Sequence, residues 1–429
     1  MSEWRNWSGS VAAHPSSIAR PKTEAELAAL VAAAGKVRVV GAGHSFMPLC
    51  ETSGLLLNLG DYEGAIDIAP DRKTVWAPAG WGLDRLTAAL WAEGLSLINQ
   101  GDINPQALAG AVATGTHGTG QDLGSISTQA CGFRLMLADG RVVECGPDQN
   151  PELYQCQRLS LGLFGVTVAI RIHVLPAYHL EERVERRPLA EVAERLDELA
   201  ATTRHMEFFI FPYSDDVIFK TLQPVPAEGA FKPGNDIDEA PFRLACQVGA
   251  AVPALIPGLQ KLMMRVSAKA TRRVGPAYEI FPSDRTIRFE EMEYEMPRAA
   301  GLPTLKAAIA YIRKRRLPIV FPFEFRLTAA DDIWMSPFNQ GPGASISFHQ
   351  YAPMDWRPPF AEIEKVFQAG GGRPHWAKRH TLTTADVHRL YPRTGDFLKV
   401  RAEVDPGQKF ANTHLTELFG LAPTPGDAT

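Results

Sequence analysis

Residues 37–45 read VRVVGAGHS, a β-branched run that leads directly into two glycines and a histidine. Glycine has no Cβ and tolerates positive φ, so such a backbone can approach a phosphate or a ring edge closely. A second run at residues 110–120, GAVATGTHGTG, offers backbone N–H groups and hydroxyls of the kind that hold phosphates. Each run alone also fits a simple turn, because the first lacks the third glycine and the ribose-binding acid of the dinucleotide fingerprint. Two such loops, with one histidine in each, indicate a large anionic cofactor.

A possible substrate site follows the alternating segment at residues 321–328, FPFEFRLT. With the period of two of a strand, Glu324 and Arg326 share one face, while the phenylalanines point the other way. An exposed ion pair is the plain alternative, and such pairs contribute little stability. The aromatic neighbours instead indicate a largely buried strand, whose acid and base need partners that a polar substrate can supply.

Two further polar groups are candidates. Ser345, Ser347 and His349 share one face of the segment at residues 344–351, where a half-exposed strand is the alternative. Lys378 follows a histidine and a tryptophan, and by itself it fits a surface lysine.

The elements that must position these residues can be read from capping and periodicity. Residues 23–26, TEAE, form a capping box that opens a helix ending near Gly35. The other expected strands occupy residues 37–40, 73–77, 133–137, 141–145, 166–174 and 205–211. The other expected helices occupy residues 83–93, 254–272, 304–316 and 360–369, one more begins at Leu189, and residues 224–238 are expected to form a surface loop.

Composition restricts the function classes. The chain has 429 residues, enough for roughly two or three domains. Its net charge of -4, from 44 basic and 48 acidic residues, implies no nucleic-acid or membrane-surface field. No apolar run reaches the roughly 20 residues of a membrane span, and the N-terminus lacks the layout of a secretory signal. The five cysteines include no CxxC pair, so we expect reduced thiols in a cytoplasmic protein and no bound metal.

Six motifs occur in an order that resembles the vanillyl-alcohol-oxidase superfamily of flavoproteins and, within it, the sugar-1,4-lactone and alditol oxidases. They are GAGHS at 41–45, GDI at 101–103, GAVATGTHGTG at 110–120, FEFR at 323–326, GGRPHWAK at 371–378 and VDPGQKFANTHL at 404–415. The resemblance implies an α+β protein with a two-domain, PCMH-type FAD-binding fold and an antiparallel-sheet substrate cap. The implied FAD domain covers residues 1–177, the cap covers 178–375, and residues 376–429 return to the FAD domain.

The resemblance also implies roles for individual residues. His44 matches the histidine that in many relatives is bonded covalently to the 8α-methyl carbon of the flavin. Glu324, Arg326 and Lys378 match polar substrate-site residues, and His349 competes with Glu324 as acceptor of the substrate's hydroxyl proton. The implied FAD contacts are Gly41, Ala42, Gly43, His44, Ser45, Asp102, Ala107, Gly110, Thr114, Gly115, Thr116, His117, Val166 and Lys378.

Two positions bear on the details of this assignment. The family usually has glycine where Ala377 stands, and the added methyl group can shift the neighbouring Lys378. Gly101 occupies the position at which relatives control oxygen access to the flavin, and a small residue there favours an oxidase.

The expected activity is therefore FAD-dependent oxidation of an alcohol of a sugar-derived polyol, with O2 as acceptor and H2O2 as product. An aldono-1,4-lactone is the preferred substrate because residues 330–334 and 371–382 look closer to lactone oxidases. The alternatives are an alditol oxidase acting on xylitol or sorbitol, a lactone dehydrogenase using another acceptor, and a flavin-binding protein without turnover. A fixed cation such as Lys378 or Arg326 would stabilise the negative charge that hydride transfer leaves on the flavin. The sequence does not indicate an oligomeric state.

Overall fold

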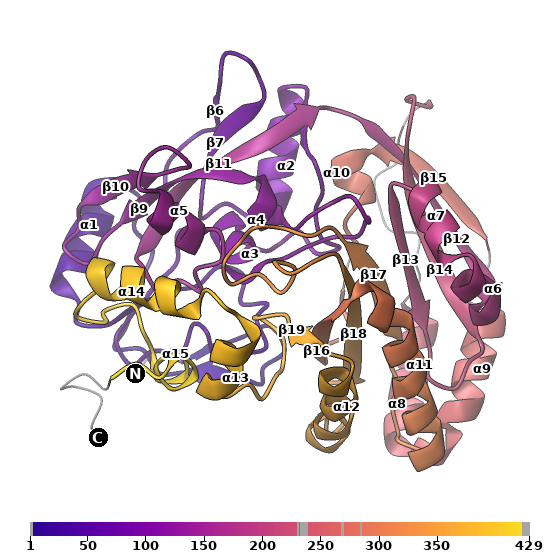
Figure 1. Ribbon diagram of the computed structural model, residues 1–429. Coiled ribbons are helices and arrows are strands. Elements are labelled where there is room, and N and C mark those ends of the chain that lie inside the picture. Colours follow the sequence, from indigo (N-terminus) through magenta and orange to yellow (C-terminus); the bar gives the residue numbers. More distant parts are fainter. Residues whose placement is uncertain (1–2, 230, 232–238, 267–269, 284, 423–429) are drawn as a thin grey trace.

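The computed structural model describes residues 3–229, 231, 239–266, 270–283 and 285–422. Two halves lie side by side (Figure 1). One contains the N-terminal segments and the C-terminal helices, and the other contains the middle of the chain around one large sheet. The expected α+β class with an antiparallel sheet in the second half is confirmed.

The first half contains two layers of sheet. A parallel three-stranded sheet has the order β3-β5-β4, and a second, antiparallel sheet has the order β10-β9-β11-β7-β6, with β8 paired to β11. The strands of this half are β1 Trp4–Arg5, β2 Ala12–Ala13, β3 Ser17–Ala19, β4 Val37–Val39, β5 Leu55–Leu57, β6 Asp67–Ile68, β7 Thr74–Pro78, β8 Leu95–Leu97, β9 Ala130–Met136, β10 Val142–Cys145 and β11 Val166–Pro176. The helices of this half are α1 Glu24–Ala33, α2 Leu83–Ala92, α3 Leu108–Thr114, α4 Ile126–Gln129, α5 Pro151–Gln157, α13 Thr384–Leu390, α14 Thr394–Val404 and α15 Thr413–Phe419.

The C-terminal helices complete the core of this first half. Trp376, Tyr391, Phe397 and Phe419 are buried in one apolar cluster with residues of β7, α2, α3 and β11. Arg38 joins the two ends of the chain, because its guanidinium donates to the carbonyls of Leu49, Leu161, Gly162 and Phe410. This packing supports the predicted return of residues 376–429, although the boundaries 1–177 and 178–375 remain a prediction.

The second half, called the cap, is built on an eight-stranded antiparallel sheet of order β15-β12-β14-β13-β17-β18-β16-β19. Its strands are β12 His179–Pro188, β13 His205–Ile210, β14 Asp216–Val225, β15 Thr271–Pro276, β16 Phe289–Pro297, β17 Phe323–Thr328, β18 Gly343–Tyr351 and β19 Arg373–Pro374. Its helices are α6 Leu189–Glu194, α7 Leu196–Thr202, α8 Ala240–Ala251, the 3-10 helix η1 Pro253–Leu255, α9 Ile256–Val266, α10 Ala277–Ile280, α11 Arg298–Arg315 and α12 Arg357–Ala369.

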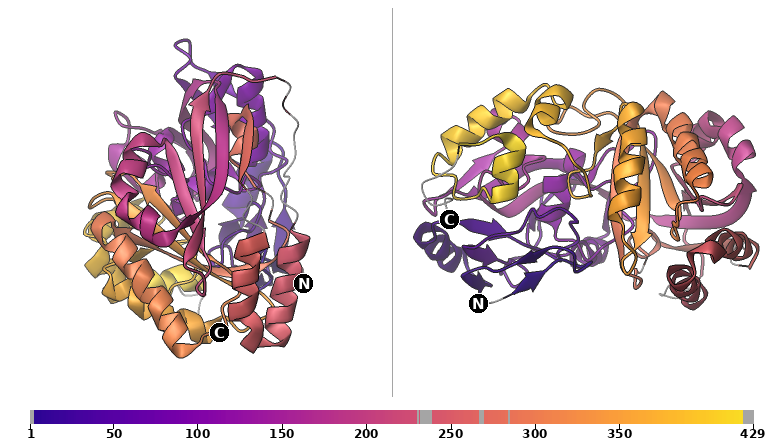
Figure 2. Two further views of the ribbon diagram at one scale, coloured as in Figure 1. Left: turned by 90° about the vertical axis from the view of Figure 1, so that its right-hand side faces the viewer. Right: turned by 90° about the horizontal axis from the view of Figure 1, so that it is seen from below.

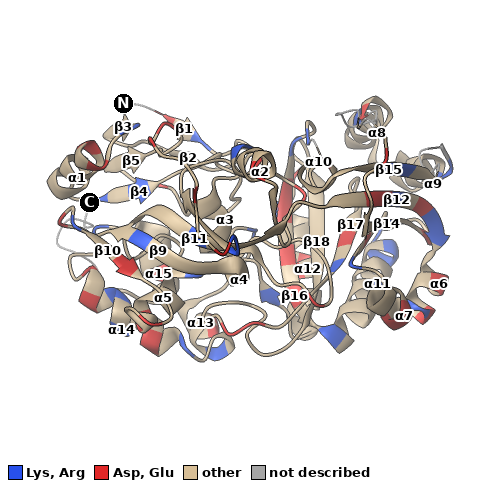
Figure 3. Cartoon of the chain, turned by 90° about the horizontal axis from the view of Figure 1, so that it is seen from above, with Lys and Arg blue, Asp and Glu red and all other residues tan. Residues whose placement is uncertain are grey.

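The two faces of the cap sheet differ in chemistry. One face is apolar, and Phe208, Phe325 and Phe348 on it pack in one cluster with Leu305 of α11 and Phe367 of α12. Figure 2 shows α11 and α12 along the sheet in two further views. The other face carries most of the polar side chains described in the next section. Helices α8 and α9 lie at the outer edge of the cap (Figure 3).

Most expected elements are present. The capping box at Thr23 is confirmed, because its side chain accepts from Glu26 N while the Glu26 side chain accepts from Thr23 N. All five cysteines are free thiols, as expected. Among the described residues, no helix is both long and apolar enough to cross a bilayer.

Three expectations about element limits are wrong. The helix expected over 254–272 ends at Val266, and Arg272 lies instead in β15, where pairing with β12 overrides helix propensity. Helix α11 begins at Arg298 rather than residue 304, because Pro303 is accommodated inside the helix rather than starting it. Residues 224 and 225 still belong to β14, and most of the loop expected over 224–238 lies outside the described residues.

Candidate active site

A cavity of about 810 Å³ lies between the two halves and is lined by residues of both. This volume is in the upper part of the roughly 300–1,000 Å³ range of ligand pockets. The backbone of the first half forms one part of the wall, and the polar face of the cap sheet forms another. The predicted site residues that line the cavity are Gly41, Ala42, Gly43, His44, Ser45, Asp102, Ala107, Gly110, Thr114, Thr116, His117, Glu324, Arg326, His349 and Lys378.

The first glycine loop follows β4 and approaches the second loop closely. A Cβ at Gly41 would lie 2.6 Å from the Cβ of Ala107, so no larger residue fits between the loops as they stand. Gly43 adopts a φ of +71°, which L side chains rarely adopt. The absence of both side chains leaves exposed backbone along this wall of the cavity.

His44 follows these glycines and is half-buried beside the cavity. Its ring stacks on Trp7, with 5.3 Å between ring centroids and 24° between the planes. Burial, and then the charge of Lys378, lowers the pKa of His44 to about 4. The imidazole is therefore neutral at pH 7, which is the form that has a free nitrogen lone pair.

The second glycine run is only partly a loop. Residues 110–114 belong to α3, which ends at Gly115 with a φ of +76°. The expectation of one continuous loop over 110–120 is therefore wrong, because apolar residues at 108, 111 and 112 pack this segment as a short helix. Thr114 and Thr116 line the cavity, whereas Gly115 does not.

Val166 turns its side chain away from the cavity. The side chain is buried in a core cluster with Leu27 and Met136, whereas the neighbouring Gly165 and Thr167 line the cavity. Val166 itself does not line the cavity.

Asp102 reaches across to the cap. Its carboxylate accepts from Ser283 Oγ at 2.8 Å and from Arg285, and Lys220 Nζ lies 3.6 Å from its Oδ1. Burial alone would raise the pKa of Asp102, but Arg285 and Lys220 outweigh it and hold that pKa below its ordinary value. Its side chain therefore links the two halves at the cavity wall.

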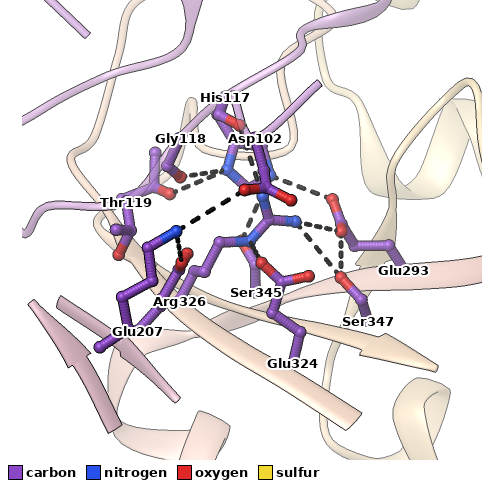
Figure 4. Close-up of polar contacts among 12 residues, drawn as sticks. Asp102, His117, Gly118, Thr119, Glu207, Glu293, Glu324, Arg326, Ser345 and Ser347 are labelled. Atoms are coloured by element: carbon purple, nitrogen blue, oxygen red, sulfur yellow. Dashed lines mark hydrogen bonds and ion pairs between the residues drawn. The ribbon is translucent and has the colours of Figure 1, made fainter. Parts of the chain in front are cut away.

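Arg326 on β17 is the centre of a buried polar network (Figure 4). Its Nη2 lies 2.5 Å from Glu293 Oε2 and donates to Ser347 Oγ at 3.3 Å, and Nη1 donates to the His117 carbonyl at 3.5 Å. The neighbouring β13 and β18 bring Glu207 and Ser345 directly opposite Arg326 in the sheet. Three separate segments, namely β16, β18 and the loop at His117, thus hold the guanidinium.

Glu324 lies on the same face of β17, as the alternation predicts. Its Oε1 is 3.3 Å from Arg326 Nε, but neither atom has a hydrogen-bond partner among the described residues. Burial raises the pKa of Glu324 to about 7, although Arg326 opposes the shift. Two buried polar atoms beside the cavity are therefore available to hydroxyl groups of a ligand.

Three glutamates of β16 stand beside these residues and were not predicted. Glu291, Glu293 and Glu295 alternate along the strand and pair in register with His349, Ser347 and Ser345 of β18. The hydroxyl groups of Ser345 and Ser347 donate to Glu295 and Glu293. The period-two spacing of these acids, interleaved with Met292, Tyr294 and Met296, is the signal that could have identified them.

His117 extends from the first half into this glutamate row. Its Nε2 lies 3.1 Å from Glu293 and 3.3 Å from Glu295, and its Nδ1 lies 2.8 Å from the Gly118 carbonyl. Burial disfavours its charge, but Glu295 and Glu293 outweigh burial and raise the pKa of His117 to about 9. The side-chain N and O atoms of His117, Glu293 and Glu295 lie within 4.8 Å of one another, as in a possible metal site. Because His117 is protonated, these three side chains instead form a cluster of ion pairs.

Lys378 and His349 meet at Glu291. Lys378 donates to Glu291 Oε2, and His349 Nε2 lies 3.4 Å from the other carboxylate oxygen. His349 Nδ1 also lies 3.1 Å from the Pro322 carbonyl, so both ring nitrogens are engaged. Burial would raise the pKa of Glu291, but Lys378 and His349 lower it to about 2.

The segment carrying Lys378 is joined to the first glycine loop. The carbonyl of Ala377 accepts from Phe46 N at 2.7 Å and from Ser45 Oγ at 3.3 Å. Gly101 lies close by in the cavity wall, where an added Cβ would lie 3.3 Å from the His117 carbonyl.

These residues fit an FAD group. Gly41 and Gly43 let the first loop pack closely against Ala107 and Trp4, and both glycines line the cavity in which a large cofactor would lie. Buried atoms of Glu324 and Arg326 that make no hydrogen bond lie on the cap side of the same cavity, where a substrate would contact the redox-active end.

Comparisons with known proteins agree with this geometry. Residues 170–418 match the family described as D-arabinono-1,4-lactone oxidase, and residues 15–146 match the FAD binding domain. The chain is 36% identical to L-gulono-1,4-lactone dehydrogenase of Mycobacterium tuberculosis, over 97% of this chain and 99% of that protein. It is 30% identical to L-gulonolactone oxidase of Scyliorhinus torazame, over 97% and 98% of the two chains. The fold is similar to that of cholesterol oxidase from Brevibacterium sterolicum, with a TM-score of 0.82 at 15% identity, covering 97% and 96% of the two chains.

Proposed function

The chain belongs to the D-arabinono-1,4-lactone oxidase family of FAD-dependent oxidoreductases, and from this premise we propose that its substrate is an aldono-1,4-lactone and its acceptor O2. As a member of this family, it oxidises alcohol groups of sugar-derived compounds and uses FAD. The observation that carries the proposal is that Glu324 Oε1 and Arg326 Nε, which face each other at 3.3 Å beside the cavity, have no hydrogen-bond partner among the described residues. A lactone ring with several hydroxyl groups offers both donors and acceptors to this pair.

Glu324 is the residue we assign to the substrate's hydroxyl proton. A general base works best with a pKa near the working pH, and the raised pKa of Glu324, about 7, meets that condition. His349 is the less suitable candidate because both of its nitrogens already face partners. Bound FAD would accept the hydride that leaves the substrate carbon bearing this hydroxyl group.

Arg326 and Lys378 act as fixed cations in this proposal. Each is held by a buried glutamate, Arg326 by Glu293 and Lys378 by Glu291, so neither needs to reorganise during the reaction. Their positive charge would favour the negative charge that hydride transfer leaves on bound FAD.

Covalent attachment of FAD through His44 is part of the proposal. A nucleophilic imidazole must be neutral, and the low pKa of His44 and its position in the cavity wall support that role. The remaining predicted FAD contacts, from Gly41 to Lys378, stand as proposals on the same cavity lining.

A dehydrogenase is the second candidate, because the 36% identical relative carries that name. The glycine at position 101 does not decide between the two, since its neighbours at 3.3 Å also leave little room for a side chain. The deciding experiment measures H2O2 release by the purified FAD-loaded protein in air, with L-gulono-1,4-lactone and xylitol compared side by side.

Peroxide formed from the lactone would support the proposal, whereas peroxide from xylitol alone would assign an alditol oxidase. If neither compound gives peroxide but the lactone bleaches the flavin absorbance without oxygen, the acceptor is not O2. If neither compound bleaches it, the substrate proposal is wrong.

A further inference from the structure

Exposed apolar side chains are concentrated on the helical hairpin formed by α8, η1 and α9, called here the α8–α9 hairpin. The described part of the chain has five exposed large apolar residues, and four belong to this hairpin. They are Leu244, Val252, Leu255 and Leu262, with exposed fractions of 61%, 47%, 50% and 57%. Residues 251–255, AVPAL, are all exposed and form the tip of the hairpin. Such a run of exposed apolar residues is unfavourable unless it has a function.

Packing within the cap does not account for this apolar surface. The opposite side of the hairpin is anchored by Cys246, Ile256 and Met264, which are all buried. Phe242 and Met263 line the cavity. A helix pair held by one face normally presents a polar outer face to water. Here the outer face carries Leu244 and Leu262 among its exposed residues, and the tip is apolar throughout.

The charge of this segment is one-sided. Residues 240–276 contain six lysines and arginines and no aspartate or glutamate, although Arg243, Arg272 and Arg273 pair with acids outside this range. Lys261 and Arg265 on α9 are exposed and have no ion-pair partner among the described residues. The net charge of the whole chain, from which no membrane-surface field was expected, does not reveal this local positive charge.

We propose that the α8–α9 hairpin docks the protein onto an anionic lipid bilayer. The tip, residues 251–255, enters the headgroup region, and Lys261 and Arg265 face the lipid phosphates. Exposed apolar surface next to basic residues that have no acidic partner in the described part of the chain, here Lys261 and Arg265, is the pattern of interfacial binding, which requires no membrane-spanning helix. Since Phe242 and Met263 lie on the other side of the same helices, docking places one wall of the cavity near the bilayer.

Vesicle flotation with the full-length FAD-loaded protein tests this proposal. We expect the protein to float with vesicles of equal parts phosphatidylglycerol and phosphatidylcholine, and to bind much more weakly to phosphatidylcholine alone. The double variant Val252→Asp/Leu255→Asp should lower the partition coefficient about tenfold or more, because it removes apolar area that the bilayer buries. Lys261→Glu/Arg265→Glu should lower it at least about fivefold for each changed charge.

Ile18→Asp is the matched control, because Ile18 is the exposed large apolar residue outside the hairpin and its replacement should leave flotation unchanged. Unchanged flavin content and circular dichroism show that each variant is folded. Flotation that the hairpin variants do not reduce would overturn the proposal, as would wild-type protein that binds no vesicle. Sedimentation velocity then shows whether the tip joins two copies of the chain, in which case Val252→Asp/Leu255→Asp converts a dimer to a monomer.

Discussion

Replacing Glu324 by glutamine tests the proposed route of the substrate proton. Glutamine keeps the size of the side chain but cannot accept a proton, and Glu324 Oε1 has no hydrogen bond to lose. A positioned general base contributes about 10²–10⁴-fold to a rate. We therefore expect Glu324→Gln to lower kcat/KM for flavin reduction by about that factor.

The pH dependence of the wild-type protein supplies a second magnitude. With a pKa of about 7, Glu324 is ionised in about one molecule in ten at pH 6. The wild-type kcat/KM should therefore rise about tenfold per pH unit below pH 7 and level off above it. The variant should lack this dependence.

Glu324→Gln should lower kcat/KM but raise the stability of the folded protein above neutral pH. The pKa of Glu324 is 4.5 in an ordinary environment and about 7 in the fold, so the folded protein holds a proton that the unfolded chain loses between these pH values. Stability contributed at this site therefore falls as pH rises through that window and stays low above it. The difference between the two pKa values corresponds to a loss of folding stability of at most about 3 kcal/mol. Glu324→Gln should raise Tm at pH 8 relative to wild type and leave it nearly unchanged at pH 4.5.

Anaerobic stopped-flow mixing measures the first effect, because loss of flavin absorbance does not depend on the acceptor. A variant whose kcat/KM stays within about threefold of wild type and keeps the inflection near pH 7 would refute the assignment of the base. His349→Asn would then test the competing residue, and a loss of the inflection in that variant would move the role to His349.

Three other substitutions test the cofactor site and the buried network. In wild type, acid precipitation should leave the yellow colour in the pellet, and His44→Ala should release it to the supernatant; a colourless wild-type pellet would exclude the covalent bond. Gly41→Ala should lower the ratio of FAD to protein, because its Cβ meets the opposing loop, whereas Gly35→Ala has open space and should not. Glu293→Gln should lower stability by about 3–5 kcal/mol, since it leaves the buried Arg326 without its charged partner, and an unchanged denaturant midpoint would contradict this.

Local signals predicted much of the fold and part of the site. The capping box at Thr23 and the alternation around Glu324 depend only on neighbouring residues, and both predicted the structure correctly. Helix α3 was missed because tertiary packing made a helix from a glycine-rich run that by itself resembles a loop.

The partners across the site could not be predicted from local sequence. Asp102 is joined to Ser283, 181 positions away, and only the docking of the two halves brings them together. The serines of β18 face the glutamates of β16 because of strand register, which the hydrophobic pattern of one strand does not specify. Glu324 was therefore predicted from its own strand, whereas the glutamates of β16 and their contacts were not.

The hydrogen bonds by which Arg38 connects the N-terminal and C-terminal parts of the chain have a consequence for biosynthesis. Arg38 and Phe410 are 372 positions apart, and α13–α15 complete the core of the half that holds the FAD-lining loops. A ribosome must therefore release almost the whole polypeptide before this half can close, and its apolar surface stays uncovered while the cap is being made. Contacts of such long sequence separation slow folding and favour aggregation of partly made chains. Cofactor capture is therefore a late event, and nascent chains halted after residue 375 should retain no FAD, which their absorbance would reveal.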